Sequence, residues 1–418
     1  MPKLLSGRKR LTILLLLILA GEAVFLLPFV LARIFRPTLL IVYDITNLEL
    51  GTCFSIYGVV AMLSYFFGGP LADRFPSRNL IAIGLWTTAL GGLVMVFVPA
   101  FNVIAIIYGF WGFTTIFLFW AALIRATREW GGTGFQGRAF GLLEGGRGLT
   151  AALIATFALL IFSWFMPVES HSNIDVQRTE SYQIVILSTS IVVFLIGILV
   201  WFFVPKKITR SGSSQQALSI TSFFKLLKMP TIWMMAVIIV CAYVGYKITD
   251  DYTLYANEVL GFNEVSAAGV GTMAFWMRPV FAVMAGFAAD RFEGTKVIIW
   301  CFALMIIGGL LTFLGVLENV TWLVLTILAT TLIGVYGLRG IYFAVMKEAG
   351  IPLISTGAAV GIMSIVGYTP DVFMGPLMGF LLDEYPGVAG HQYVFLVLML
   401  FSIVGLIVSI TFRNLVKR

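Results

Sequence analysis

Charged side chains are scarce in this sequence of 418 residues: only 11% are Asp, Glu, Lys or Arg, against roughly 25% in ordinary soluble domains. So few charges cannot coat the surface of a water-soluble protein of this length. Hydrophobic residues make up 60% of the chain, and the mean hydropathy of +1.00 shows that the apolar excess is general. The composition therefore excludes a soluble fold and indicates the lipid bilayer as solvent.

Cysteine and histidine are scarce as well. The three cysteines, Cys53, Cys241 and Cys301, lie in apolar stretches, so we expect packing residues and no disulfide framework. The two histidines, His171 and His391, fall in polar connectors, and the spacing of His, Cys, Asp and Glu resembles no metal site. We therefore expect neither a metal nor a cofactor.

What the sequence does contain is long apolar runs. A membrane-spanning helix needs about 20 mostly apolar residues, and twelve stretches meet this requirement. They lie at 11–33, 49–71, 80–99, 101–124, 138–164, 182–204, 231–257, 264–288, 297–316, 321–345, 355–382 and 392–412. The sequence thus predicts an all-α, multi-pass integral membrane protein with twelve transmembrane helices.

One connector is much longer than the others and lies near the middle of the chain. It runs from Pro205 to Pro230 and is rich in Ser, Gly and Gln. We interpret 1–204 as an N-terminal six-helix bundle, 205–230 as a cytoplasmic linker and 231–418 as a C-terminal six-helix bundle. The lysines and arginines of the connectors gather on the side of the N-terminus, with only Arg33, Arg36 and Arg178 opposite. This bias predicts that both termini are cytoplasmic.

A short motif occurs at equivalent places in the two halves. Ala72-Asp73-Arg74-Phe75 follows the second predicted helix, and Ala289-Asp290-Arg291-Phe292 follows the eighth. Either copy alone could be a charged turn that only enforces topology. Two copies at matching positions indicate an internal repeat.

Together these features resemble the major facilitator superfamily of transporters. The stretch Gly69-Pro70-Leu71-Ala72-Asp73-Arg74 matches the loop signature Gly-x-Leu-Ala-Asp-Arg of that family. The resemblance implies two pseudo-symmetric bundles, transport by alternating access, and a loop that stabilises one end state through an acid-arginine network. It also implies a bacterial inner membrane location and the conformational residues Gly69, Asp73, Arg74, Arg78, Gly286, Asp290 and Arg291.

Two departures from the signature concern the same loops. Pro76 stands where the family usually has a second glycine, and Gly294 comes one residue late in the other copy. A finer resemblance lies at 130–148, which is similar to the fourth-to-fifth helix region of sugar-phosphate-permease-like and organic-anion carriers. It implies an anionic solute.

Nine charged residues fall inside the predicted spans, where each needs a partner or a function. They are Glu22, Glu144, Arg147, Lys247, Asp250, Asp251, Arg278, Arg339 and Asp371. The pairs Glu144 and Arg147, Lys247 and Asp250, and Lys247 and Asp251 have same-face helical spacings. One interpretation is that these are self-neutralised structural pairs.

Glu22 and Asp371 are the first candidates for proton coupling, because an isolated carboxylate near mid-membrane can exchange protons as its hydration changes. Pro370 precedes Asp371 and can loosen its helix. Glu144 and Asp250 are further candidates. The alternative for the first two is a permanent salt bridge with Arg278, Arg339 or Arg147.

Binding of an anionic group requires bases and polar aromatic rings. Arg278 and Arg339 have no acid within a helical turn, so their partners must come from another helix or from a ligand. The candidates for substrate binding are Arg278, Arg147, Arg339, Lys247 and the ring residues Trp276 and Tyr246, each of which adjoins a buried base.

The sequence therefore favours a secondary active transporter of a small polar, anionic organic solute, coupled to protons. We expect it to act as a monomer in the bilayer and to bind no nucleic acid. One alternative is a proton-coupled exporter of drugs or metabolites, and another is a non-transporting receptor on the same fold. No catalytic constellation is evident, so we do not expect an enzyme.

Overall fold

The computed structural model describes residues 7–131, 136–166, 174–206, 226–315, 320–346, 348–351 and 356–417. Within these ranges the chain is helical and contains no strand. It divides into two compact units. Unit 1 comprises residues 1–212 and 262–276, and unit 2 comprises residues 213–261 and 277–418.

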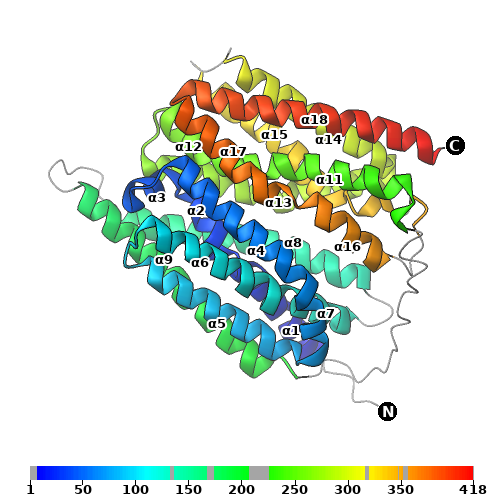
Figure 1. Ribbon diagram of the computed structural model, residues 1–418, viewed down its shortest axis with the longest axis horizontal. Helices are drawn as coiled ribbons and strands as arrows, with labels where there is room; N and C mark the ends of the chain where they lie inside the picture. The colour runs from blue at the N-terminus through cyan, green and yellow to red at the C-terminus, as the bar shows by residue number, and fades with distance from the viewer. Residues whose placement is uncertain are drawn as a thin grey trace. The chain divides into compact units, whose positions relative to one another are not determined.

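Unit 1 is built from long helices that cross back and forth, with α5 against α9, α4 against α6 and α1 against α8 (Figure 1). Its elements are α1 (Gly7–Ala23), η1 (Leu26–Val30), α2 (Leu31–Ile34), α3 (Arg36–Tyr43), α4 (Asn47–Arg74), α5 (Ser77–Met95), α6 (Phe101–Gly112), η2 (Phe113–Trp120), α7 (Ala121–Gly131), α8 (Gln136–Phe165) and α9 (Ile174–Phe203). The first turns of α13 complete it, because Ala268 and Phe275 are buried in its core.

Unit 2 follows the same plan, with α14 against both α18 and α15, and α11 against α18. Its elements are α11 (Pro230–Ile248), η3 (Thr249–Asp251), α12 (Tyr252–Glu258), the later part of α13 (Glu264–Phe292), α14 (Gly294–Phe313), α15 (Thr321–Ile341), η4 (Ala344–Met346), α16 (Thr356–Gly367), α17 (Pro370–Glu384) and α18 (Val388–Val416).

The predicted membrane fold is confirmed. Among the described residues, eleven helical stretches are long and apolar enough to cross a bilayer. The first predicted span, 11–33, differs from the others because it is a pair of helical segments, Arg8–Ala23 and Leu26–Ile34, bent by 41°. Counted as one span, this pair makes the twelfth. Large apolar side chains such as Phe97 and Trp164 are exposed, as lipid-facing residues must be.

Helix starts follow ordinary capping chemistry where the chain leaves a connector. At the start of α4, the Thr46 hydroxyl accepts from the Glu49 backbone N–H, and the Glu49 carboxylate accepts from the Thr46 N–H. This reciprocal arrangement satisfies two of the otherwise unpaired donors of the first turn. It fixes the point at which the chain re-enters the bundle.

Tight helix contacts depend on small residues. A Cβ added at Gly112 would lie 2.6 Å from the Tyr57 carbonyl oxygen, and one added at Gly334 would lie 2.5 Å from the Cys301 carbonyl oxygen. These glycines let α6 approach α4, and α15 approach α14, to backbone contact. The three cysteines are free and buried in such contacts, which confirms them as packing residues.

Replacing Gly334 by Ala is expected to destabilise the fold. The new methyl group would meet a backbone oxygen that cannot move aside, and overpacking of this kind costs about 1–3 kcal/mol. Thermal unfolding of the purified protein in detergent measures the loss. Gly361→Ala on α16 is the matched control, because a Cβ there has open space around it. An unchanged melting temperature for Gly334→Ala would contradict the close approach.

Candidate functional site

The largest group of buried charges in unit 2 is centred on Lys247, near the end of α11. Its ammonium lies 3.4 Å from an Asp250 oxygen and 3.4 Å from an Asp371 oxygen. Lys247 and Asp250 are buried, and Asp371 is nearly so. The predicted pairing of Lys247 with Asp250 is therefore confirmed, and Asp371 joins it from another helix.

Broken helices bring these groups together. The helix that begins at Pro230 changes to a 3-10 turn, η3, at Thr249–Asp251. The helix containing Asp371 breaks between α16 and α17, and Pro370 opens α17. This agrees with the loosening expected from Pro370. Asp371 thus sits in the first turn of α17, where the positive end of the helix favours a carboxylate.

Asp371 is also linked to an aromatic cluster. The Tyr243 hydroxyl donates to both Asp371 oxygens, at 3.2 and 3.0 Å. The ring of Tyr243 lies 4.9 Å from that of Tyr368 and 5.5 Å from that of Tyr246, centroid to centroid. The Tyr342 and Tyr368 hydroxyls are 3.3 Å apart.

Arg339, near the end of α15, is the cation of this tyrosine cluster. Its guanidinium carbon lies 3.7 Å from the Tyr246 ring centre and 5.6 Å from that of Tyr243. Its Nη1 is buried and has no hydrogen-bond partner among the described residues. Nor does any carboxylate in that part of the chain form an ion pair with it. Arg339 is thus held by aromatic faces with a donor left over.

Unit 1 contains a second buried ion pair. The Arg147 guanidinium on α8 lies 3.2 Å from a Glu22 oxygen and 2.8 Å from a Glu144 oxygen. It also lies over the rings of Phe25 and Trp120, at 5.5 and 5.3 Å. Glu22 is therefore paired with one of the three arginines foreseen for it. Glu144, in contrast, has half of its side chain exposed.

Irregular helix geometry surrounds this pair. Glu22 lies just before the π-helical segment η1, which contains Pro28, and Trp120 is the last residue of the π-helical segment η2. Such segments insert an extra residue into a turn and occur often at functional sites. Glu22, four residues before η1, and Trp120, at the end of η2, both contact Arg147.

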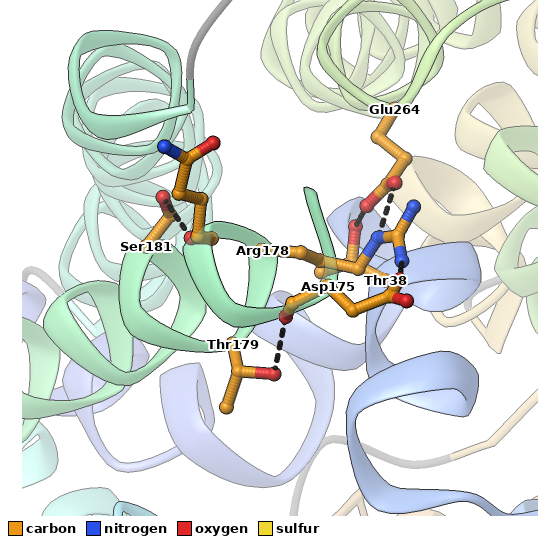
Figure 2. Close-up of polar contacts among 7 residues, drawn as sticks. Thr38, Asp175, Arg178, Thr179, Ser181 and Glu264 are labelled. Carbon is orange, nitrogen blue, oxygen red and sulfur yellow. Dashed lines mark hydrogen bonds and ion pairs between the residues drawn. The ribbon is translucent and has the colours of Figure 1, made fainter. Parts of the chain in front are cut away.

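A third polar cluster lies at the start of α13 (Figure 2). Arg178 of α9 donates to Glu264 at 2.6 Å and also to Asp175, and the Thr38 hydroxyl donates to Glu264 at 2.5 Å. Arg178 and Glu264 are almost buried, whereas Asp175 is exposed. Sequence reasoning missed Glu264. The available signal was that Arg178 is one of only three bases that the sequence predicts for the side opposite the N-terminus.

The two loop motifs are held differently. In unit 1, Arg125 of α7 donates to the Ala72 carbonyl and pairs with Glu129 at 2.9 Å. Arg78 lies over the Trp201 ring at 5.0 Å, while Arg74 is exposed. The side chain of Asp73 lies outside the described part of the structure, and a Cβ at Gly69 would meet nothing within 4 Å.

In unit 2 the motif loop is fixed by a carboxylate from a distant connector. Glu348 accepts from the backbone N–H of Gly294 at 2.8 Å and from the Thr295 hydroxyl at 2.8 Å. It thereby caps the N-terminus of α14. A Cβ at Gly294 would lie 2.7 Å from Val345. This contact explains why the glycine stands one residue late in the signature.

The neighbouring Glu293 has a positive φ of 76°, and its side chain is exposed. Lys417, Lys296 and Arg413 surround its carboxylate at 3.3 to 3.7 Å. Desolvation opposes ionisation, but the hydrogen bond from Lys417 and the charges of Lys296 and Lys417 hold the pKa of Glu293 below its ordinary value. In the last turns of α13, Asp290 and Arg291 are exposed, and a Cβ at Gly286 would meet nothing within 4 Å. Arg291 lies near the Phe292 ring.

Two predicted binding residues lie in different units. Arg278 is buried in the part of α13 that belongs to unit 2. Trp276 belongs to unit 1, is 40% exposed, and donates from its indole nitrogen to the Thr156 hydroxyl at 2.9 Å. Their roles in substrate binding stay predictions.

Two expectations about unit 2 are wrong. His391 is not in a polar connector: it lies in α18 and is fully buried. Asp251 does not pair with Lys247: its carboxylate contacts the His391 Nδ1 at 2.8 Å, because the 3-10 turn directs Asp250 and Asp251 to different neighbours. The four-residue spacing assumed a regular α-helix through this point.

Comparison with known proteins identifies the family. A family model described as Major Facilitator Superfamily matches residues 11–368, which is most of the chain. The chain belongs to the major facilitator superfamily. Among its relatives, this superfamily member is 29% identical to inner membrane protein YqcE of Escherichia coli over 375 residues, covering 88% of this chain and 86% of YqcE. It is 26% identical to inner membrane protein YihN of the same organism, covering 98% and 96%.

A solved structure supports the same fold. A bacterial homologue of the human lysosomal transporter Spinster, in an inward-facing conformation, matches with a TM-score of 0.73 at 14% identity, covering 99% of this chain and 98% of that one. The family and this fold indicate a multi-pass membrane transporter rather than an enzyme. Among the described residues no group of three or more His, Cys, Asp or Glu could hold a metal ion.

Removing Arg147 is expected to destabilise unit 1 strongly, since it takes away the cation that faces the buried carboxylate of Glu22. Breaking one side of a buried pair costs on the order of 3–5 kcal/mol. Arg147→Met should lower the melting temperature well below that of wild type, and the double variant Glu22→Gln/Arg147→Met should recover part of the loss.

The exposed Arg74 provides a control, because Arg74→Met removes a guanidinium of the same size from the end of α4. It should change the melting temperature little. Additive effects of Glu22→Gln and Arg147→Met would show that the two side chains do not interact.

Proposed function

We propose that this protein is a secondary active transporter of a small organic anion, and that Arg339 receives the anionic group. The observation that carries the proposal is the buried guanidinium nitrogen of Arg339 that has no partner among the described residues. A buried cation needs a compensating charge. In that part of the chain none is supplied to it by a carboxylate.

The surroundings of Arg339 suit a carboxylate or phosphate ligand. A guanidinium can donate two parallel hydrogen bonds to such a group, and these charge-assisted bonds are the strong ones. The tyrosines 243, 246, 342 and 368 provide hydroxyl donors and flat faces within the same cluster. They would recognise the uncharged part of a polar organic solute.

Proton coupling is proposed for Asp371. This carboxylate accepts from Tyr243 and pairs with Lys247, so gaining a proton would weaken both contacts. Tyr243 also lies against Arg339, at 5.6 Å from its guanidinium carbon. Binding of an anion to Arg339 and of a proton to Asp371 would therefore act on the same tyrosine. Glu22, Glu144 and Asp250 stay second candidates for proton binding.

Several broader features belong to the same proposal. Transport proceeds by alternating access in a monomer, with the protein in a bacterial inner membrane and both termini in the cytoplasm. The inner membrane relatives and the lysines and arginines of the connectors support this arrangement. Export of cationic drugs is the rival function, and the unpartnered nitrogen of Arg339 favours the anion instead.

Arg339→Gln is expected to weaken anion binding about tenfold to a hundredfold, as loss of a charged hydrogen bond costs about 1.5–3 kcal/mol. A thermal-shift screen of the wild type against organic acids, sugar phosphates and cationic drugs first identifies a stabilising compound, since a ligand stabilises the state that it binds. Titration of that compound into the variant then measures the loss.

Arg413→Gln, at the far end of α18, is the matched control and should leave binding unchanged. Stabilisation by cationic drugs alone would overturn the proposal in favour of an exporter. Equal affinities of wild type and Arg339→Gln for an anion would place the anion site elsewhere.

Asp371→Asn is expected to separate proton coupling from substrate movement. In proteoliposomes the variant should still exchange labelled anion for unlabelled anion, because exchange needs no net proton transfer. It should lose accumulation driven by a pH gradient. Accumulation at the wild-type rate would show that Asp371 carries no coupled proton.

A further inference from the structure

We propose that His391, held between Asp251 and Glu258, is a proton-binding site that positions Asp250 in the Lys247 cluster and so makes that cluster sensitive to pH. The proposal rests on the proposed function only in treating the Lys247 cluster as part of the transport site. The three residues lie within unit 2, on α18, η3 and α12. None of them belongs to the cluster of tyrosines around Arg339.

The distances within the triad of His391, Asp251 and Glu258 require a bound proton. The Nδ1 of His391 lies 2.8 Å from an Asp251 oxygen, and its Nε2 lies 3.2 Å from a Glu258 oxygen. A neutral imidazole carries one N–H, and an ionised carboxylate can only accept. Both contacts are hydrogen bonds only if the ring is an imidazolium or one carboxyl carries a proton. As arranged, the triad holds one proton more than a neutral histidine with two carboxylates.

Burial makes that proton important to Asp251. The side chains of His391 and Asp251 are completely buried, and the second oxygen of Asp251 has no hydrogen-bond partner among the described residues. Within that part of the chain, compensation for the Asp251 charge comes from His391. If the triad lost its proton, the contact that holds Asp251 would be lost or would have to rearrange.

The proton has a route to this site. The side chain of Glu258 is 36% exposed, and it contacts the outer nitrogen of the ring, whereas Asp251 contacts the inner one. Glu258, His391 and Asp251 therefore form a line from the end of α12 to the buried turn η3. An exposed carboxylate, a histidine and a buried carboxylate in sequence can pass a proton inward.

Among the described residues, the charged groups that contact His391 are Asp251 and Glu258. The ring of Tyr255 on α12 lies edge-on at 5.3 Å. On α17, the backbone oxygens of Leu381 and Tyr385 pack against Gly390, while Asp383 and Glu384 of the same helix are exposed. The ionisable groups that the structure places against the imidazole are thus Asp251 and Glu258, with the phenol of Tyr255 beside them.

The turn η3 connects this site to the transport cluster. Asp250 and Asp251 are adjacent, yet Asp251 contacts His391 and Asp250 contacts Lys247. A shift of one carboxylate in a three-residue 3-10 turn must move the other. Protonation of the triad therefore holds Asp250 against Lys247, and loss of the proton releases it. His391 is a positioning residue that acts through Asp251.

The first test is the pH dependence of thermal stability in detergent between pH 5 and 9. The folded triad keeps a proton that a histidine in the unfolded chain releases above roughly pH 6.5. The unfolded state then binds fewer protons than the folded state, so the melting temperature of the wild type should fall as the pH rises through this range. His391→Gln should remove that fall. Glu293→Gln, before α14 and in contact with Arg413 at the other end of α18, should retain it.

Two further variants keep the test decisive. If His391→Gln does not fold, Glu258→Gln changes only the exposed partner. It should make the fall of the melting temperature smaller, because the fall starts at the same pH but ends at a lower one. The melting temperature of the double variant Asp251→Asn/His391→Gln should not change with pH. It should also be higher than that of His391→Gln alone, because no carboxylate charge is left buried at position 251. A wild type whose melting temperature does not change with pH would overturn the proton site. So would a His391→Gln variant whose melting temperature falls with pH as steeply as that of the wild type.

The connection to Lys247 is tested by a double-mutant cycle between His391→Gln and Asp250→Asn. We expect shifts in melting temperature that do not add at pH 6 and that become additive at the higher pH where the fall of the wild-type melting temperature has ended and the folded triad has also lost its proton. Additive shifts at both pH values would show that η3 does not couple His391 to Asp250. No anion is used, so failure here leaves the Arg339 proposal intact, and failure of anion binding leaves this result intact.

Discussion

The structure depends on one constraint: a charge placed among apolar helices must be compensated where it stands. Water is not available to solvate it, and the cost is several kcal/mol for an unpaired ion. Each described unit meets this constraint with a compact group in which one basic side chain forms ion pairs with two acidic side chains. Arg147 contacts Glu22 and Glu144, and Lys247 contacts Asp250 and Asp371. Arg339 meets it differently, with aromatic faces.

The need to compensate buried charges also explains where the helices break. Glu22 precedes a π-helical segment, the adjacent Asp250 and Asp251 lie on a 3-10 turn, and Asp371 opens a new helix after Pro370. A regular helix presents neighbouring residues about 100° apart and fixes which faces they can reach. A break relaxes that rule, so charged groups from different helices can meet. In this protein the irregular turns and the buried charges are parts of the same arrangement.

The sequence was sufficient for much of the fold. Apolar runs predicted the membrane helices, and three-residue spacing predicted the pairs of Glu144 with Arg147 and Lys247 with Asp250. It was insufficient wherever the partner lies far along the chain. Nothing local to His391 indicates Asp251, and nothing local to Glu264 indicates Arg178. The cap that Glu348 gives to α14 is likewise a tertiary contact.

The π-helical segments have a consequence for the way in which such a chain tolerates length changes. A π-helical turn contains one residue more than the α-helical turn it replaces. If one residue were lost from Leu26–Val30, an ordinary α-helical turn could replace the π-helical one, and the residues on either side would keep about the same relative directions. A residue lost from the regular helix α2 (Leu31–Ile34) would instead rotate the residues before it by about 100° relative to the residues after it. Glu22 would then face a different neighbour, although neither Glu22 nor its partners had been substituted. Along this first helix, side-chain direction is therefore set by residue count as much as by residue identity.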